Sequence, residues 1–179
     1  ISGLDVDEAN LLLRNLEFFK KENLIFIDRA LIEKIINSND YVEKFFVFKR
    51  YPSSLEIKIK KTKLLAYVNR NGNYFLLGSN KRFIKTNNIA KDIPFIFGDF
   101  NSQEFFKLKK AIDYSNFDYS EIENLFFFQS GRWDIKTKSG ILIKLPKDKL
   151  KESLNFAINI LLNDKIKNNK LIDLRQQKQ

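Results

Sequence analysis

The chain has 179 residues, 44% of them hydrophobic, and carries a formal net charge of +10. It contains neither cysteine nor histidine, which excludes disulfides, thiolate metal sites and cysteine nucleophiles and removes the commonest general base. No apolar run approaches the roughly 20 residues that a membrane-spanning helix needs. Because the chain begins at Ile1 and contains no methionine, we expect a fragment, and any anchoring or targeting segment is expected to precede residue 1.

The positive charge suggests a nucleic-acid partner or an anionic surface. However, the chain is rich in lysine, isoleucine, asparagine and phenylalanine, as is usual for AT-rich genomes, and lysine outnumbers arginine by 25 to 7. Specific nucleic-acid sites depend on the planar arginine fork for bidentate contacts. The composition therefore favours a solvated, lysine-rich surface over a dedicated binding patch.

The first 66 residues predict the order strand, helix, helix, strand, strand. Residues 1–3 fit the end of a first strand that is largely missing. Helices are predicted over residues 7–19 and, with Asp28 as the N-cap, over residues 28–37. The expected buried side chains recur at spacings of three and four: Leu12, Leu16 and Phe19 in the first helix, and Leu31, Ile32, Ile35 and Ile36 in the second.

Two strands are predicted next, over residues 42–50 and 55–61. The first interleaves aromatic and basic residues, a pattern that single-stranded nucleic-acid platforms use to stack bases. Phe46 and Phe48 fall on one side of this strand, and the opposite side carries a phenylalanine and a valine. Two apolar faces favour a strand that is buried under helices over an exposed platform.

The polar, glycine-containing segment 69–73 is the predicted boundary between two parts of the chain. Beyond it, a helix of about 13 residues is expected from Asn101, which has Glu104 as a capping-box partner three positions on. Trp133 is predicted to be a core residue packed against the last helix. The remaining predicted elements are strands near 74–77, 81–85, 122–129, 132–137, 141–145 and 170–174, and a helix near 147–163.

Candidate groups for chemistry are few. The carboxylate pairs (Asp5/Asp7, Glu121/Glu123 and Asp148/Glu152) lie near helix starts or on the outer face of a strand, whereas a general acid needs a desolvated pocket. Residues 37–40 lack the glycine and the terminal glutamate of a calcium loop, and no phosphate-binding glycine loop occurs. The sequence therefore predicts no catalytic residue, no cofactor site and no metal site.

The predicted final strand is the candidate binding site, because a terminal strand leaves backbone N–H and C=O groups free for another protein. Residues of a strand alternate between its faces, so Ile172 and Leu174 are expected to point into the domain. The fork of Arg175 suits a partner carboxylate. The predicted partner-binding residues are Leu171, Asp173, Arg175 and Gln176.

Three motifs resemble the bacterial cell-division family FtsQ (DivIB). Residues 50–59, Arg-Tyr-Pro-Ser-Ser-Leu-Glu-Ile-Lys-Ile, are similar to the strand–turn–strand signature of the POTRA domain in that family. Arg-Trp-Asp, Gly-Ile and Leu-Pro within residues 132–146, followed by Ile-Asp-Leu-Arg at 172–175, resemble its C-terminal β domain. Ile93-Pro94 followed by Gly98 fits the same pattern. Gly78-Ser79-Asn80-Lys81 departs from it, since the family often has Asp-x-x-Gly there.

This resemblance implies an α+β fold in two domains. Residues 1–66 would form a POTRA domain of two helices on a three-stranded sheet, with its first strand truncated. Residues 67–179 would form a larger β domain, with a mainly antiparallel sheet and flanking helices.

The resemblance also implies a function. The protein would be a non-enzymatic scaffold of the divisome that links early and late division proteins. It would span the inner membrane once, with this part in the periplasm at the septum. FtsB- and FtsL-like proteins would be its partners, and no cofactor or nucleic acid would be expected. The alternative is a protein that binds nucleic acid or an anionic surface, for which a contiguous basic stripe with exposed phenylalanines would be the indication.

Overall fold

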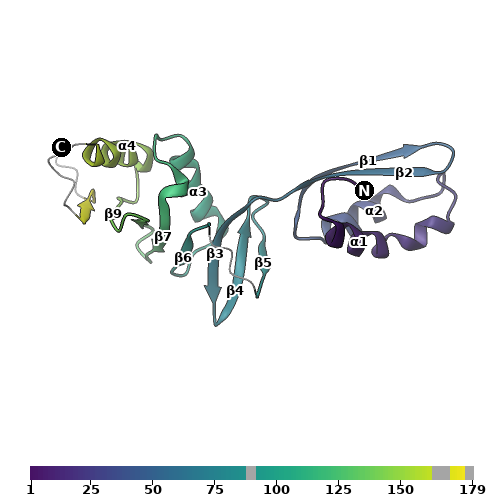
Figure 1. The fold of residues 1–179 in the computed structure, drawn as a ribbon, viewed down its shortest axis with the longest axis horizontal. Coiled ribbons are helices and arrows are strands. Elements are labelled where there is room, and N and C mark those ends of the chain that lie inside the picture. Colours follow the sequence, from purple (N-terminus) through teal and green to yellow (C-terminus); the bar gives the residue numbers. More distant parts are fainter. Residues whose placement is uncertain (88–91, 163–169, 176–179) are drawn as a thin grey trace. The chain divides into compact units, whose positions relative to one another are not determined.

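The computed structural model describes residues 1–87, 92–162 and 170–175. The chain divides into two compact units, one made of residues 1–64 and 78–84 and the other of residues 65–77 and 85–179. Figure 1 shows the elements along the chain. The backbone thus passes between the units three times.

The first unit contains two α-helices, a short 3₁₀-helix and a β-hairpin. Figure 1 shows both helices on the same side of the hairpin. Asp28 caps the second helix as predicted, because its Oδ1 accepts a hydrogen bond from the backbone N–H of Ala30 at 2.8 Å. The elements are α1 (Val6–Asn15), the 3₁₀-helix η1 (Glu17–Lys21), α2 (Arg29–Asn37), β1 (Val42–Arg50) and β2 (Ser54–Lys61).

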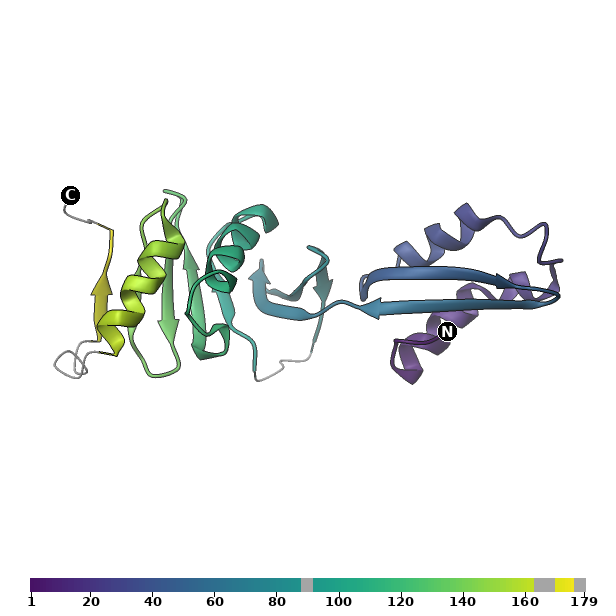
Figure 2. The same cartoon turned by 90° about the horizontal axis from the view of Figure 1, so that it is seen from above.

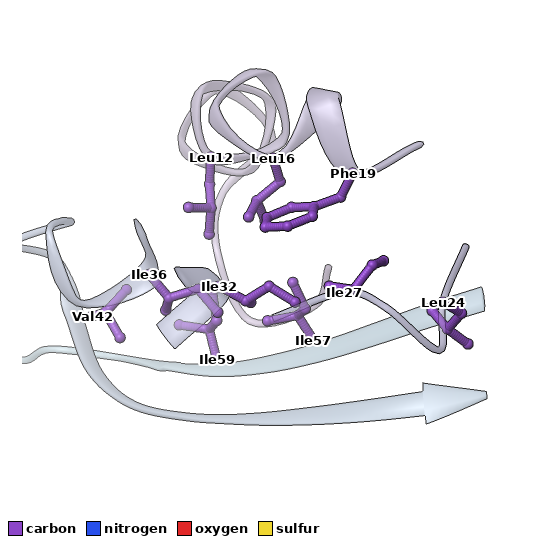
Figure 3. Close-up of a cluster of buried hydrophobic side chains, with 10 residues drawn as sticks. All are labelled: Leu12, Leu16, Phe19, Leu24, Ile27, Ile32, Ile36, Val42, Ile57 and Ile59. Atoms are coloured by element: carbon purple, nitrogen blue, oxygen red, sulfur yellow. The ribbon is translucent and has the colours of Figure 1, made fainter. Parts of the chain in front are cut away.

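Apolar side chains from the helices and the inner face of the hairpin form one core (Figure 3). This core confirms most of the predicted helical stripes. Leu31 is the exception, because it lies at the margin of the contact and remains 39% exposed. The buried members are Leu12, Leu16, Phe19, Leu24, Ile27, Ile32, Ile36, Val42, Ile57 and Ile59.

Strands β1 and β2 pair in antiparallel fashion, and a single residue of the N-terminal segment pairs with β2. The N–H of Ser2 donates to the carbonyl of Ile57 at 3.0 Å, and the N–H of Ile59 donates to the carbonyl of Ser2 at 2.8 Å. The expected stub of a third strand is therefore one parallel bridge beside a two-stranded sheet.

The prediction that both faces of β1 are buried was wrong. Phe46 is 61% exposed and Phe48 is 43% exposed. The physical reason is that both helices lie on the face that carries Ile57 and Ile59, and no other element of the first unit covers the opposite face.

Residues 78–84 complete the first unit by binding the end of α2 and the start of β1. Asn80 Nδ2 donates to the carbonyls of Asp40 at 2.7 Å and Val42 at 3.0 Å. Arg82 Nη1 donates to the carbonyls of Asn37 at 2.6 Å and Asn39 at 3.3 Å. The last carbonyls of a helix have no partner within the helix, so Arg82 satisfies the final carbonyl of α2, while Asn80 holds the loop between α2 and β1.

From residue 64 onward the chain forms a mixed eight-stranded sheet in the order β10-β9-β8-β7-β6-β3-β4-β5. The pairs β7–β8 and β8–β9 are antiparallel, whereas β10–β9, β6–β7 and β3–β6 are parallel. The elements are β3 (Leu64–Arg70), β4 (Asn73–Gly78), β5 (Phe83–Lys85), β6 (Phe95–Phe97), α3 (Ser102–Asp113), the 3₁₀-helix η2 (Tyr119–Glu121), β7 (Ile122–Phe127), β8 (Trp133–Thr137), β9 (Leu142–Lys144), α4 (Leu150–Leu161) and β10 (Leu171–Asp173).

These elements confirm the predicted α+β class. The polar segment 69–73, however, contains a tight turn between β3 and β4. Asn71 and Gly72 have φ angles of 51° and 79°, values typical of the Asn-Gly turn of a two-residue hairpin. Strand β6 was not predicted, because its partners β3 and β7 are distant in sequence and parallel pairing leaves no local signal.

Helices α3 and α4 contact each other and lie over one face of the sheet (Figure 2). Asn101 caps α3 as predicted, with Glu104 completing the capping box. Trp133 is only 2% exposed, which confirms that it is a core residue. Its ring lies 4.8 Å from the ring of Phe127 and 5.7 Å from that of Phe100, and Leu150 at the start of α4 lines the same small cavity.

Candidate protein-binding edge

Strand β10 is the last strand of the sheet and pairs with β9 alone in the described part of the chain. The register is parallel, with Ile172 opposite Ile143. Ile172 and Leu174 are 6% and 4% exposed, so they point into the domain as the alternation predicted. Their burial against the sheet holds β10 in place and fixes its register.

The backbone of β10 has one bonded side and one open side. The N–H of Leu142 donates to the carbonyl of Lys170, and the N–H of Leu174 donates to the carbonyl of Lys144, each at 2.9 Å. Alternate residues of a parallel strand direct their N–H and C=O groups to the same neighbour. Leu171 and Asp173 therefore direct their backbone groups away from β9, toward the open edge.

The side chains at this edge are an exposed leucine and an ion pair. Leu171 is 49% exposed. Arg175 Nε donates to Asp173 Oδ1 at 2.8 Å and to Oδ2 at 3.0 Å, and Arg175 Nη2 also bonds Oδ2. These hydrogen bonds lower the pKa of Asp173 to about 2. Arg175, which we expected to be available to a partner carboxylate, is bonded within its own chain.

The same carboxylate also closes the backbone edge. Asp173 Oδ1 accepts a hydrogen bond from the backbone N–H of Arg175 at 3.1 Å. Residue 175 lies two positions beyond the end of β10, and if the alternation of the strand continued, its N–H would be the next donor on the open side. The side chain of Asp173 therefore binds the backbone N–H that an added partner strand would otherwise use to extend its pairing beyond β10. Gln176, the fourth predicted contact residue, lies outside the described residues.

A row of charges crosses the sheet beside this edge. Asp134 of β8 is opposite Lys144 of β9, and Lys144 is opposite Asp173 of β10. Asp134 is 3% exposed, and this burial raises its pKa, although nearby cations oppose the shift, Arg132 most strongly. The Nε of Arg132 lies 3.8 Å from Asp134 Oδ1, too far for a hydrogen bond.

This charge row was missed by sequence reasoning, although a signal for it exists. Ile135 and Ile143 mark the buried face of their strands, so their neighbours Asp134 and Lys144 had to share the other face. The pairing of the strands, which brings the two charges together, was not evident from either strand alone.

The described residues contain no group of three or more carboxylates positioned to hold a metal ion. A cavity of about 600 Å³ in the first unit is lined mainly by apolar side chains, including Leu16, Phe19 and Ile57, with Lys20 and Glu22 beside them. Within the same described ranges, no helix combines the length and apolarity needed to cross a bilayer.

The fold and the open edge define an α+β protein with a terminal strand suited to strand addition. Residues 61–175 match the family model described as "Cell division protein FtsQ/DivIB, C-terminal". The chain belongs to the FtsQ/DivIB family of cell-division proteins, which confirms the resemblance seen in its motifs.

The other comparisons add a structural relative. No curated protein matches the chain. A solved structure, the major extracytoplasmic domain of the trans isomer of the bacterial cell division protein DivIB from Geobacillus stearothermophilus, matches with 15% identity and a TM-score of 0.43. The match covers 57% of this chain and 95% of that one. Family membership assigns the chain a scaffold role in cell division that operates through protein–protein interactions.

Proposed function

We propose that this chain is the periplasmic part of a non-enzymatic division scaffold that links early and late division proteins. In this proposal a single transmembrane segment anchors the protein in the inner membrane at the septum, and residues 1–66 serve as a POTRA domain for recruitment. Residues 67–179 act as the β domain and bind FtsB- and FtsL-like partners. The open edge of β10 is the observation that carries the proposal.

Binding proceeds by strand addition to β10. The outward N–H and C=O groups of Leu171 and Asp173 pair with a partner strand and set its register. Leu171, which is 49% exposed, contributes apolar contact on the face opposite Ile172. Specificity then comes from the side chains of alternate residues, while the backbone hydrogen bonds supply general affinity.

The Asp173–Arg175 pair controls how far this ladder extends. While Asp173 holds the backbone N–H of Arg175, pairing ends at Asp173. A partner carboxylate that binds the guanidinium leaves this N–H on Asp173, so the ladder still ends there and the partner is held through the fork of Arg175. The fork of Arg175 accepts such an exchange because it can hold a second carboxylate in the same bidentate geometry.

The test compares proline and alanine at position 171. Proline removes an N–H that points to the open edge and that β9 does not use, so the fold should persist. Titration calorimetry with the periplasmic segment of an FtsB-like partner should show that Leu171→Pro lowers the binding affinity by about 100-fold or more. This corresponds to about 2–3 kcal/mol of binding free energy. Leu171→Ala keeps the backbone N–H, so its binding affinity should fall much less. Equal binding by the two variants would place the interface elsewhere.

A further inference from the structure

The hairpin of the first unit has one face that no other described element of that unit covers. We call it the open hairpin face. Its residues are those that alternate with the buried Ile57 and Ile59 and with their partners on β1. They are Lys44, Phe46, Phe48 and Arg50 from β1, and Ser54, Glu56, Lys58 and Lys60 from β2.

Two phenylalanines form an apolar ridge along this face. The ring centroids of Phe46 and Phe48 lie 6.4 Å apart, and their planes are inclined by 20°. Both side chains remain largely in solvent, at 61% and 43% exposure. Single exposed apolar residues are common, whereas adjacent stacked rings on an otherwise charged face indicate an interaction surface.

The charges around the ridge are mostly positive. The strand register places Lys44 opposite Lys60, and Phe46 opposite Lys58. Glu56 is the one carboxylate of the open hairpin face, and it is held by Arg50 at 2.9 Å and by Lys58 at 3.2 Å. Three lysines and an arginine stand against this glutamate and against Glu43, which lies at the neighbouring irregularity of β1 and binds Lys60 at 2.8 Å, so the net charge remains positive.

We propose that the open hairpin face docks on an anionic lipid bilayer. Phenyl rings on a flat surface can enter the boundary between headgroups and acyl chains, and lysine ammonium groups can reach the lipid phosphates from the rim. The long stems of Lys44 and Lys60 allow their charges to stay in the headgroup layer while the rings lie deeper. This inference does not depend on partner binding by β10.

A single-stranded nucleic acid fits the same face less well. Base stacking requires an open ring face, but the two rings stack on each other, and the Nζ of Lys58 lies 5.7 Å from the ring centroid of Phe48. The one arginine fork on the face, that of Arg50, is already bonded to Glu56. The positive charge is otherwise supplied by lysines, which suit diffuse phosphate layers better than bidentate base contacts.

The test is sedimentation of the whole chain with vesicles of phosphatidylcholine containing about one-third phosphatidylglycerol, compared with pure phosphatidylcholine. We expect binding only to the anionic vesicles. Phe46→Ser with Phe48→Ser, and separately Lys44→Gln with Lys58→Gln, should each weaken binding at least about tenfold. Because all four positions are exposed, circular dichroism should show an unchanged fold.

Matched controls make the same chemical changes at other exposed positions. Lys34→Gln with Lys110→Gln removes two charges from α2 and α3, and Phe26→Ser with Phe156→Ser removes two rings that are 77% and 50% exposed. Both control pairs should bind like the parent chain. The proposal is overturned if no anionic-lipid binding occurs or if the controls lose as much as the face variants. It is also overturned if a labelled oligothymidylate binds more tightly than vesicles and is lost with Phe46 and Phe48.

Discussion

The carboxylate of Asp173 accepts hydrogen bonds from both the guanidinium and the backbone N–H of Arg175. One side chain therefore neutralises the nearest cation and caps the open edge of β10. The arrangement makes the state of this edge dependent on a single acidic group. Loss of this carboxylate should free both the backbone N–H and the guanidinium of Arg175 for a binding partner.

Asp173→Ala should lengthen the accessible ladder, and its effect on binding should differ from that of Arg175→Ala. The first variant frees the N–H and the guanidinium for a partner, so we expect binding of the FtsB-like segment to strengthen a few-fold, about the value of one added hydrogen bond. The second removes the fork but leaves the N–H capped, so binding should weaken. Calorimetry with the same partner segment would measure both, and identical changes would argue against a capping role.

The Asp173 carboxyl should titrate near pH 2 in the folded protein. Its pKa lies below the ordinary value of 3.8, so the pair's contribution to stability is present above that value and is lost as the pH falls through about 2. The two side chains are 38% and 36% exposed, so solvent screening keeps this contribution small. An NMR titration that follows the carboxyl chemical shift of Asp173 would measure this pKa. In the Arg175→Gln variant, the midpoint of the titration should move back toward 3.8.

Removal of Arg132 should be costly because it leaves the carboxylate of Asp134 buried without its nearest cation. Arg132→Leu is expected to lower the free energy of unfolding at neutral pH by about 1–2 kcal/mol, less than for a fully buried pair because Arg132 is partly exposed. Burial raises the folded-state pKa of Asp134, so this loss should shrink as the pH falls through that pKa and the carboxyl becomes neutral. Urea denaturation at several pH values would measure this pH dependence of the free energy of unfolding. Adding Asp134→Asn to the Arg132→Leu variant should recover most of the lost stability.

Trp133→Ala should destabilise the second unit by about 3–5 kcal/mol, the usual cost of truncating a buried aromatic side chain. The cavity would lie between Phe127 and Phe100, whose rings contact the indole. Trp133→Phe keeps much of the volume and should cost clearly less. Chemical denaturation would measure the two values, and a change below about 1 kcal/mol for the alanine variant would be typical of a surface site.

Gly98 should tolerate no side chain, whereas Gly72 should accept one at a modest cost. Both have a positive φ, 104° and 79°, so alanine is strained at either position by about 1 kcal/mol. A Cβ at Gly98 would lie 2.2 Å from the carbonyl oxygen of Phe127, whereas at Gly72 nothing lies within 4 Å. Thermal unfolding should therefore show a much larger loss for Gly98→Ala than for Gly72→Ala.

Local patterns predicted most of the elements because their causes are local. The caps at Asp28 and Asn101 and the alternation of Ile172 and Leu174 depend on residues within one turn or one strand. The exposure of Phe46 was not predictable in this way. Periodicity tells which side chains share a face, but whether another element covers that face depends on packing between segments that are distant in sequence.

In the candidate site, too, features with local causes were predictable and features that depend on distant segments were not. The orientation of Leu171 follows from strand alternation, and the sequence predicted it. The bond between Asp173 and Arg175 could have been inferred from their spacing, since residues two apart in a strand share a face. The charge row through Asp134 could not, because it depends on which strands become neighbours in the sheet.

Synthesis from the N-terminus imposes an order on folding. The last carbonyl of α2, that of Asn37, receives a donor from Arg82, and the carbonyl of Asp40 in the loop that follows receives one from Asn80. Both donors leave the ribosome only after β3 and β4 have been made. A nascent chain that ends near residue 66 therefore has both helices and the hairpin but lacks the segment that fastens them. We expect such an intermediate to form its core early and to gain full protection of α2 from hydrogen exchange only after residue 84 has emerged.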